Sequence, residues 1–185
     1  MATVKQHREE QYWSRFAHSY DRDGEYIVGN PILQAIVKRL SEEQDLGDCI
    51  ELGCGTGYLT RAVAGNARHV VATDLSDQML EVARIQLSEF QNVTIQKADC
   101  ANTGFLAERY DSVLMANLIH VIDAPVPCLQ ESYRILRNGG LLIVVDFTGY
   151  RLGLFRTAQL GLRYLRRWGV PPRHGRNDLS PEELV

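Results

Sequence analysis

The sequence has no apolar run long enough to cross a membrane, no paired-cysteine motif and no excess of basic residues. None of its 185 residues falls in an uninterrupted apolar stretch near the ~18–20 residues that a membrane helix needs. The formal net charge of -3 argues against a nucleic-acid-binding protein, and the polar first residues do not resemble a signal peptide. The cysteines form no C-x-x-C pair and lack a histidine cluster, so reduced thiols in a cytoplasmic protein are expected rather than a metal site or disulfides: Cys49, Cys54, Cys100 and Cys128.

What the sequence does contain is a glycine-rich turn after a short apolar run. Residues 49–58 read CIELGCGTGY, with glycines at positions 53, 55 and 57. Glycines let the backbone turn tightly and let a ligand press against main chain where a Cβ atom would collide. The next apolar run ends in Asp74, 21 positions after Gly53, which is a usual distance for a carboxylate that binds ribose hydroxyls. A glycine turn alone is weak evidence, but the turn and the acid together predict a nucleoside ligand.

The glycine spacing also separates two kinds of nucleoside site. The dinucleotide pattern is G-x-G-x-x-G, with a pyrophosphate at the helix N-terminus. Here the third glycine comes one residue early, at Gly57, and Tyr58 stands where the dinucleotide pattern has glycine. Glu51 places a carboxylate just before the turn, which disfavours a pyrophosphate and favours a cationic ligand with hydroxyl and amine groups. A nicotinamide-dependent oxidoreductase is therefore the less favoured alternative.

Four further motifs follow in order along the chain. With the glycine turn at 51–57 (ELGCGTG), they are 74–80 (DLSDQML), 97–100 (KADC), 110–117 (YDSVLMAN) and 136–146 (LRNGGLLIVVD). Together the five motifs resemble the class I S-adenosylmethionine-dependent methyltransferases, in the branch with many small-molecule, quinone-type enzymes. The resemblance extends from about Tyr12 to Phe147. It implies S-adenosylmethionine as methyl donor, S-adenosylhomocysteine as product and a small-molecule methyl acceptor.

The resemblance also implies which residues bind the cofactor. Asp74 would bind the ribose, Asp99 and the backbone of Cys100 the adenine, and Tyr20 would close over the cofactor. The complete expected set is Tyr20, Glu51, Gly53, Cys54, Gly55, Gly57, Asp74, Leu75, Met79, Asp99, Cys100, Asn117 and Leu118.

Several of these residues have a plainer interpretation that the sequence leaves open. Tyr20 could simply pack in a helix, Asp99 could be a loop acid, and Cys100 could be a buried thiol. Glu51 could order the turn instead of contacting the methionine portion of the cofactor.

Periodicity predicts an α/β fold with a doubly wound, mostly parallel, Rossmann-like sheet. Continuous apolar runs, typical of buried parallel strands, indicate strands near 48–53, 69–74, 93–97, 110–116 and 140–147. Helices are expected near 4–18, 31–41, 57–65, 76–90 and 125–137, with a break at 21–24 (DRDG) after the first. We expect a helical cap over 1–45, a cofactor-binding core over 46–148 and a substrate-cap segment over 149–185. The family that the sequence resembles usually has seven strands, and we expect no counterpart of the last two here, so we expect a fragment or a second chain covering the fifth strand.

The segment after the fifth strand is basic and amphipathic. Residues 151–176 contain seven arginines and no acid. A helical wheel places Leu154, Ala158, Gly161, Leu165 and Trp168 on one face, flanked by 155, 162 and 164, with the arginines at 156, 163 and 167 opposite. Three interpretations stay open: a helix packed on the domain with a solvated basic face, a substrate lid, or a weak membrane-surface contact through 151–168.

Methyl transfer from a sulfonium needs mainly alignment and a dry site, and a general base only if the acceptor must lose a proton. His120, just after the fourth expected strand, is the best-placed candidate for a base or a substrate contact. We therefore predict a methyltransferase of unidentified acceptor, with a non-catalytic cofactor-binding module of the same fold as the alternative. No metal and no nucleic-acid partner are expected, and a homodimer is left open.

Overall fold

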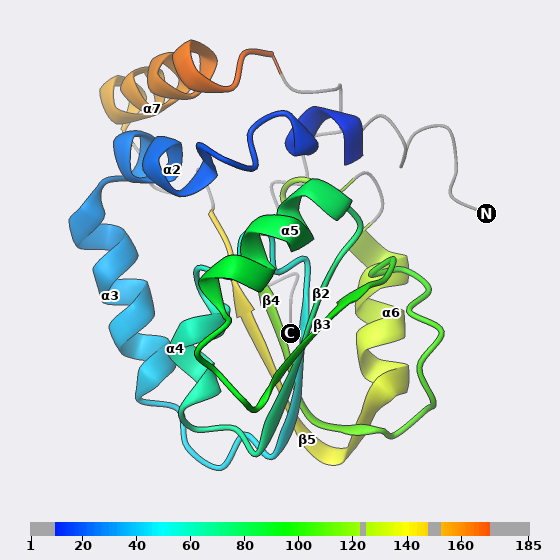
Figure 1. Ribbon diagram of the computed structural model, residues 1–185. Coiled ribbons are helices and arrows are strands. Elements are labelled where there is room, and N and C mark those ends of the chain that lie inside the picture. Colours follow the sequence, from blue (N-terminus) through cyan, green and yellow to red (C-terminus); the bar gives the residue numbers. More distant parts are fainter. Residues whose placement is uncertain (1–9, 123–124, 148–152, 171–185) are drawn as a thin grey trace.

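Five parallel strands form the centre of the structure, a computed structural model that describes residues 10–122, 125–147 and 153–170 (Figure 1). They are β1 (Asp48–Leu52), β2 (His69–Asp74), β3 (Val93–Lys97), β4 (Tyr110–Ala116) and β5 (Leu136–Val145). The strand order is β3-β2-β1-β4-β5, so the order reverses between β1 and β4. The predicted doubly wound parallel sheet is confirmed. In such sheets ligands bind beyond the carboxyl ends of the strands at this reversal point.

Successive residues of β1 pack on opposite faces of the sheet because side chains alternate along a strand. Cys49 packs with Val63 of α4 (Thr60–Ala64), while Ile50 packs with Cys128 and Ile135 of α6 (Pro125–Ile135). Both faces are therefore covered, as the continuous apolar strands predict.

Two further helices pack beside the elements that follow β1 and β2. The helix α5 (Asp77–Gln86) follows β2, and Ser76 caps it by accepting a hydrogen bond from the Met79 N–H at 3.2 Å. The helix α3 (Asn30–Ser41) begins with Pro31 in its first turn and contacts α4. These elements fix the two loops that leave β1 and β2.

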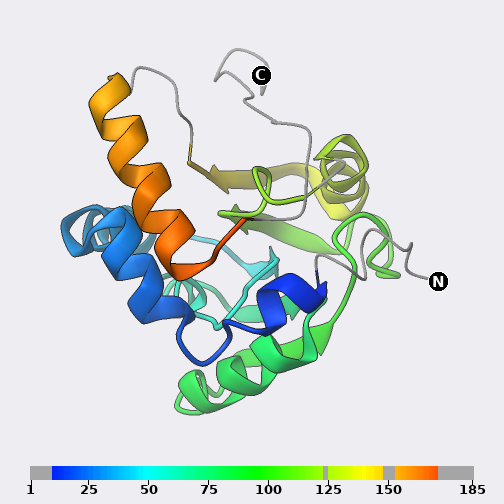
Figure 2. The same ribbon diagram turned by 90° about the horizontal axis from the view of Figure 1, so that it is seen from above.

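A helical cap lies over the carboxyl ends of the strands (Figures 1 and 2). It consists of a short helix at 10–14, the helix α2 (Tyr20–Val28) and the helix α7 (Leu154–Arg167). Residues 4–9 of the first expected helix lie outside the described residues. The expected break at 21–24 is wrong, because α2 runs through it. Asp21 and Asp23 occupy the first turn of α2, where acids interact favourably with the helix dipole.

The buried face of α7 differs from the expected one. Leu160, Tyr164 and Trp168 pack against the N-terminal aromatic residues, whereas Leu154 and Leu165 are 92% and 51% exposed. Tyr164 and Trp168 are aromatic and bury more area than Leu154 and Leu165 would, and this fixes the rotation of the helix.

Two arginines of α7 also depart from the expected solvated face. The Arg167 guanidinium lies 3.3 Å from the Asp23 carboxylate and over the Tyr26 ring, and Arg163 also lies over that ring. The α2 helix therefore offers the arginines partners that a helical wheel cannot show. Membrane-surface contact through 151–168 stays a prediction.

The start of β5 was also predicted too late. The helix expected at 125–137 ends at Ile135, and the strand expected at 140–147 begins at Leu136. The pairing shifts between Tyr110 and Ser112, and Gly139 adopts a φ of 75°. The glycine pair therefore forms an irregularity inside β5. No helix among the described residues is both long and apolar enough to span a bilayer.

Candidate active site

A cavity of about 1020 Å³ lies at the carboxyl ends of the strands and is lined on one side by helices of the cap. The loops after β1, β2 and β4 line it, together with α2 and α7. Thirteen of the fourteen residues expected in the site line this cavity: Tyr20, Glu51, Gly53, Cys54, Gly55, Asp74, Leu75, Met79, Asp99, Cys100, Asn117, Leu118 and His120. Gly57 does not line it.

The three glycines of the turn have different roles. All have positive φ angles, between 54° and 82°. A Cβ atom on Gly53 would lie 2.6 Å from Leu118, and one on Gly57 would lie 2.6 Å from Leu87, so these two glycines allow close packing within the protein. A Cβ atom on Gly55 would meet nothing within 4 Å. Because Gly55 lines the cavity, this open space fits a ligand pressed against the backbone.

Asp74 lies at the end of β2, with its carboxylate held by backbone groups. One oxygen accepts a hydrogen bond from the Gly55 N–H at 2.9 Å, and the other accepts from the Ser76 N–H at 2.8 Å. Burial raises the pKa of Asp74, although these backbone bonds oppose the shift. The carboxylate therefore has a fixed direction and spare lone pairs for hydroxyl groups of a ligand.

Glu51, in β1, is 1% exposed and lies close enough to Asp74 for the two charges to repel. Its carboxylate accepts a hydrogen bond from the Thr60 hydroxyl at 2.5 Å. Burial raises the pKa of Glu51 to about 7, with a smaller contribution from the charge of Asp74. The contact with Thr60 shows that Glu51 orders the start of α4, and its place on the cavity wall also leaves it near a ligand.

Asn117 follows β4 in a left-handed conformation, with a φ of 55°. Its backbone N–H donates to the Val145 carbonyl at 2.7 Å, which ties the end of β4 to β5. Its side-chain oxygen is buried and has no hydrogen-bond partner among the described residues. Since Asn117 lines the cavity, this oxygen is available to a donor group of a ligand.

The cap is fastened to the glycine turn by Asp21. Its carboxylate accepts hydrogen bonds from the Thr56 hydroxyl at 2.5 Å and from the Gln86 amide at 2.7 Å. Tyr20 is thereby placed over the cavity and stacks on Trp168, with ring centroids 5.2 Å apart. Burial raises the pKa of Tyr20, and the charges of Asp74, Asp21 and Asp146 add to the shift.

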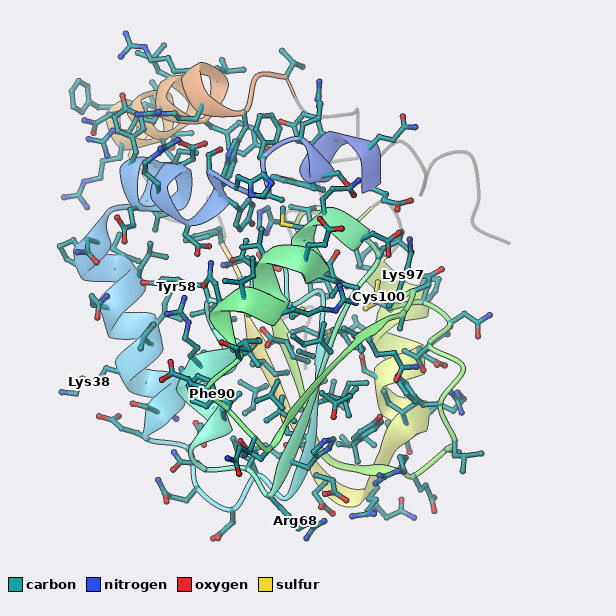
Figure 3. All side chains as sticks on the ribbon, in the orientation of Figure 1. Lys38, Tyr58, Arg68, Phe90, Lys97 and Cys100 are labelled. Carbon is teal, nitrogen blue, oxygen red and sulfur yellow. The ribbon has the colours of Figure 1, made fainter. Side chains whose placement is uncertain are left out.

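The first helix is fastened near the end of β3. The Lys97 ammonium lies 2.7 Å from the Asp77 carboxylate and 3.1 Å from that of Glu10. Figure 3 shows Lys97 and Cys100 together near this corner of the sheet. Asp99 accepts a hydrogen bond from the Ala101 N–H at 2.9 Å, so it also shapes the loop that lines the cavity.

On the far side of the cavity, His120 meets Asp146. The Nδ1 atom of His120 is hydrogen-bonded to the Asp146 carboxylate, and the backbone N–H of His120 donates to it at 3.2 Å. Asp146 is the last residue of the motif at 136–146, but no role was predicted for it from the sequence. The available signal was its position directly after an apolar strand, the same signal that identified Asp74.

Aromatic residues of the cavity were also missed. Trp13 and Trp168 lie edge to face with ring centroids 5.4 Å apart, and both line the cavity. Their contact joins segments far apart in the sequence, so local periodicity could not indicate it. The described residues include no group of three histidines, cysteines or acids that could hold a metal ion.

Comparison with known proteins agrees with this geometry. The family profile described as "Methyltransferase domain" matches residues 50–144, about half of the chain. The chain therefore belongs to the methyltransferase domain family, which confirms the predicted resemblance. The match contains the glycine turn, Asp74 and most of β5.

Relatives and solved structures are similar to this chain over part of their length. A demethylmenaquinone methyltransferase of Clavibacter sepedonicus is 31% identical over 132 residues, which are 70% of this chain and 54% of that protein. A malonyl-[acyl-carrier protein] O-methyltransferase of Halalkalibacterium halodurans is 30% identical over 148 residues, 75% of this chain and 54% of that protein. A SAM-dependent methyltransferase of Thermotoga maritima superposes with a TM-score of 0.60 at 27% identity, covering 72% and 59% of the two chains. The chain thus spans about half the length of these curated relatives.

Proposed function

We propose that the chain transfers a methyl group from S-adenosylmethionine to a small-molecule acceptor. The observation that carries this proposal is the half-buried Asp74 carboxylate, fixed by two backbone N–H groups beside a cavity where Gly55 leaves open space. Ribose hydroxyls are suitable donors to such a carboxylate. The relatives named above support the reaction class, and they act on chemically different acceptors.

Charge in the cofactor half of the cavity favours a cationic ligand. Glu51 and Asp74 both line it, and burial disfavours the ionised form of each. A ligand with a sulfonium and an ammonium group would offset that cost, whereas a pyrophosphate would increase it. This charge supports S-adenosylmethionine over a nicotinamide dinucleotide.

The cavity has room for an acceptor beside the cofactor. Its volume of about 1020 Å³ is at the upper end of ordinary ligand pockets. The acceptor half is formed by α7, α2 and the loops after β4 and β5, including Val28, Leu160 and Phe147. S-adenosylmethionine would supply an activated methyl group, so these residues would align the acceptor and exclude water.

Calorimetric titration tests the proposal. We expect micromolar binding of S-adenosylhomocysteine, no binding of NAD, and at least about tenfold weaker binding in Asp74→Ala, since charge-assisted hydrogen bonds contribute roughly 1.5–3 kcal/mol. Glu81→Ala is the matched control, because Glu81 is an exposed acid on the adjoining helix α5 and does not line the cavity. Binding of NAD in place of S-adenosylhomocysteine, or unchanged affinity in Asp74→Ala, contradicts the proposal.

A transfer assay separates the enzyme from the non-catalytic alternative. Methyl-labelled S-adenosylmethionine is incubated with the chain and a panel of phenols, amines and carboxylic acids. We expect label in at least one class of acceptor. Tight cofactor binding without any transfer would support a binding module.

A further inference from the structure

The histidine on the acceptor side of the cavity is held by a carboxylate that accepts three hydrogen bonds, two of them from the histidine itself. Asp146 accepts hydrogen bonds from His120 Nδ1, from the His120 backbone N–H at 3.2 Å and from the Phe147 backbone N–H at 2.7 Å. The Asp146 side chain is 14% exposed and that of His120 is 32% exposed. The ring also lies edge to face with Phe147, with centroids 5.9 Å apart. Backbone and side-chain contacts therefore fix both the carboxylate and the ring.

This arrangement determines which ring nitrogen can act in the cavity. A carboxylate accepts, so in the neutral imidazole Nδ1 carries the proton and Nε2 keeps its lone pair. His120 lines the cavity, and among the residues that the structure describes no group is hydrogen-bonded to Nε2. Nε2 is thus the ring nitrogen left to accept a proton from a bound molecule.

The position of the pair in the fold suits the acceptor rather than the cofactor. His120 follows β4 and Asp146 follows β5, while Asp74 is the last residue of β2, on the other side of the reversal point. The cavity wall next to the pair along the chain includes the apolar residues Val121, Ile122 and Phe147, together with the polar Asn117. A small apolar molecule with one polar group directed at Nε2 fits this lining.

We propose that Asp146 is a positioning residue that makes His120 a general base, and that the methyl acceptor carries an acidic hydroxyl group, as in a phenol, quinol or enol. This inference rests on the proposed methyltransferase activity and names the acceptor class for the same site. A neutral amine would attack without prior loss of a proton and would make no use of such a pair, whereas a hydroxyl must give up its proton.

The hydroxyl acceptor, His120 and the methyl donor account for every proton and electron of the proposed transfer. The hydroxyl proton moves to Nε2, the freed electron pair of the oxygen or of its conjugated carbon bonds to the methyl carbon, and the electrons of the carbon–sulfur bond return to sulfur. His120 then carries the positive charge that the sulfonium loses. The Asp146 carboxylate stabilises that imidazolium, as an acid behind a histidine base does in other enzymes.

Nitrogen-15 NMR of the histidine side chains distinguishes the two neutral tautomers and tests the positioning without turnover. We expect His120 to be protonated at Nδ1, with His120→Gln used to assign its signals. In Asp146→Ala the proton should move to Nε2. His69 serves as an internal control, because its ring is hydrogen-bonded to Thr94 and should not change. An Nε2–H tautomer in the unaltered protein overturns the inference.

The acceptor class is tested with a matched pair of probes in the presence of S-adenosylhomocysteine. We expect 1-naphthol to shift the His120 Nε2 resonance, because its hydroxyl donates to that nitrogen. The ether 1-methoxynaphthalene has the same ring and no such proton, and it should leave Nε2 unchanged. Equal effects of the two probes contradict a hydroxyl acceptor.

Transfer to 1-naphthol separates positioning from structure. Asp146→Asn keeps an oxygen that accepts from Nδ1, so the tautomer should persist while the negative charge is lost. We expect this variant to lower kcat by about tenfold with KM within threefold, and His120→Gln to lower kcat about 100-fold, in the range of general-base effects. Unaltered kcat in both variants overturns the inference. Failure of S-adenosylhomocysteine to bind the unaltered protein contradicts the proposed function instead.

Discussion

Acidic side chains occur at both ends of the sheet, but their partners differ and their pKa values shift in opposite directions. At the amino ends of the strands, the Asp48 carboxylate lies 2.8 Å from Arg68 and 3.0 Å from Arg109, and Arg68 lowers the pKa of Asp48 to about 2. At the carboxyl ends, the buried Glu51 and the half-buried Asp74 accept hydrogen bonds from hydroxyl and N–H groups, and removal from solvent raises both pKa values. Figure 3 shows Arg68 at the far end of the molecule from Tyr58 and Cys100.

The difference shows at which end of the sheet the protein itself balances the charges of its acidic side chains. Arginines balance the acids at the amino ends, so that end needs nothing further to be stable. The acids in the cavity accept from neutral donors and carry an electrostatic cost in the free protein. Such a cost is typical of a site that a cationic ligand occupies, which agrees with the proposed cofactor.

The largest expected effect comes from Glu51→Gln. The folded pKa of Glu51 is about 7 against a reference of 4.5, so the ionised form is disfavoured by folding. Ionisation of Glu51 therefore does not destabilise the folded protein below about pH 4.5. The destabilisation grows between about pH 4.5 and pH 7 and is fully present above about pH 7. We therefore expect Glu51→Gln to raise the free energy of unfolding by up to about 3 kcal/mol at pH 8 and to change it little at pH 4.5. Urea denaturation at the two pH values measures this.

Glu131→Gln is the matched control for that experiment. Glu131 is also buried, but Arg134 lowers its pKa to about 2, and Thr103 donates to it. Its ionised form is therefore favoured by folding, so Glu131→Gln should destabilise the protein at pH 8. The same sign of change in both variants contradicts the comparison.

The two ends of the sheet can be compared directly through two glycines with positive φ angles, one at each end. A Cβ atom on Gly47, at the amino ends, would lie 2.3 Å from an Asp111 oxygen, while one on Gly55 would point into open space. We expect Gly47→Ala to lower the free energy of unfolding by about 2 kcal/mol and to leave cofactor affinity unchanged. Gly55→Ala should cost only the backbone strain, about 1 kcal/mol.

The two glycine variants should separate more clearly in ligand binding. Calorimetric titration should show that Gly55→Ala weakens S-adenosylhomocysteine binding by at least tenfold, because the added methyl group occupies the ligand's space. Weaker binding in Gly47→Ala than in Gly55→Ala contradicts the assignment of the open space to the cofactor.

The smallest expected effect is at the paired end. Asp48→Asn removes a partner from Arg68 and Arg109, whose side chains are 65% and 44% exposed. Solvent screening limits the loss to less than about 1 kcal/mol at pH 7. Because the folded pKa of Asp48 is lowered, its contribution is present above about pH 4 and is lost as the pH falls through about 2. Unfolding at 0.05 and 1 M salt should show the difference between Asp48→Asn and the unaltered protein shrink with salt, whereas the effect of Glu51→Gln should persist.

The strands and the cofactor half could be predicted from the sequence, because their signals are local. Continuous apolar runs specify buried parallel strands, and an acid directly after such a run marks the carboxyl edge of the sheet. The cap could not be predicted in the same way. Its helices α2 and α7 take their orientation from contacts such as Tyr12 Oη to the Trp168 carbonyl at 2.8 Å, between residues 156 positions apart. Acids at 21 and 23 appeared to break a helix whose first turn they occupy.

The stacked aromatic residues above the cavity have a practical consequence. The chain has only two tryptophans, Trp13 and Trp168, and both line the cavity. All of its indole fluorescence therefore originates at the binding site, with Tyr20 in stacking contact with Trp168. Entry of a ligand will change the polarity and quenching around both rings. Occupancy of the site can thus be followed by the intrinsic emission of the unlabelled protein, in equilibrium titrations and in stopped-flow measurements.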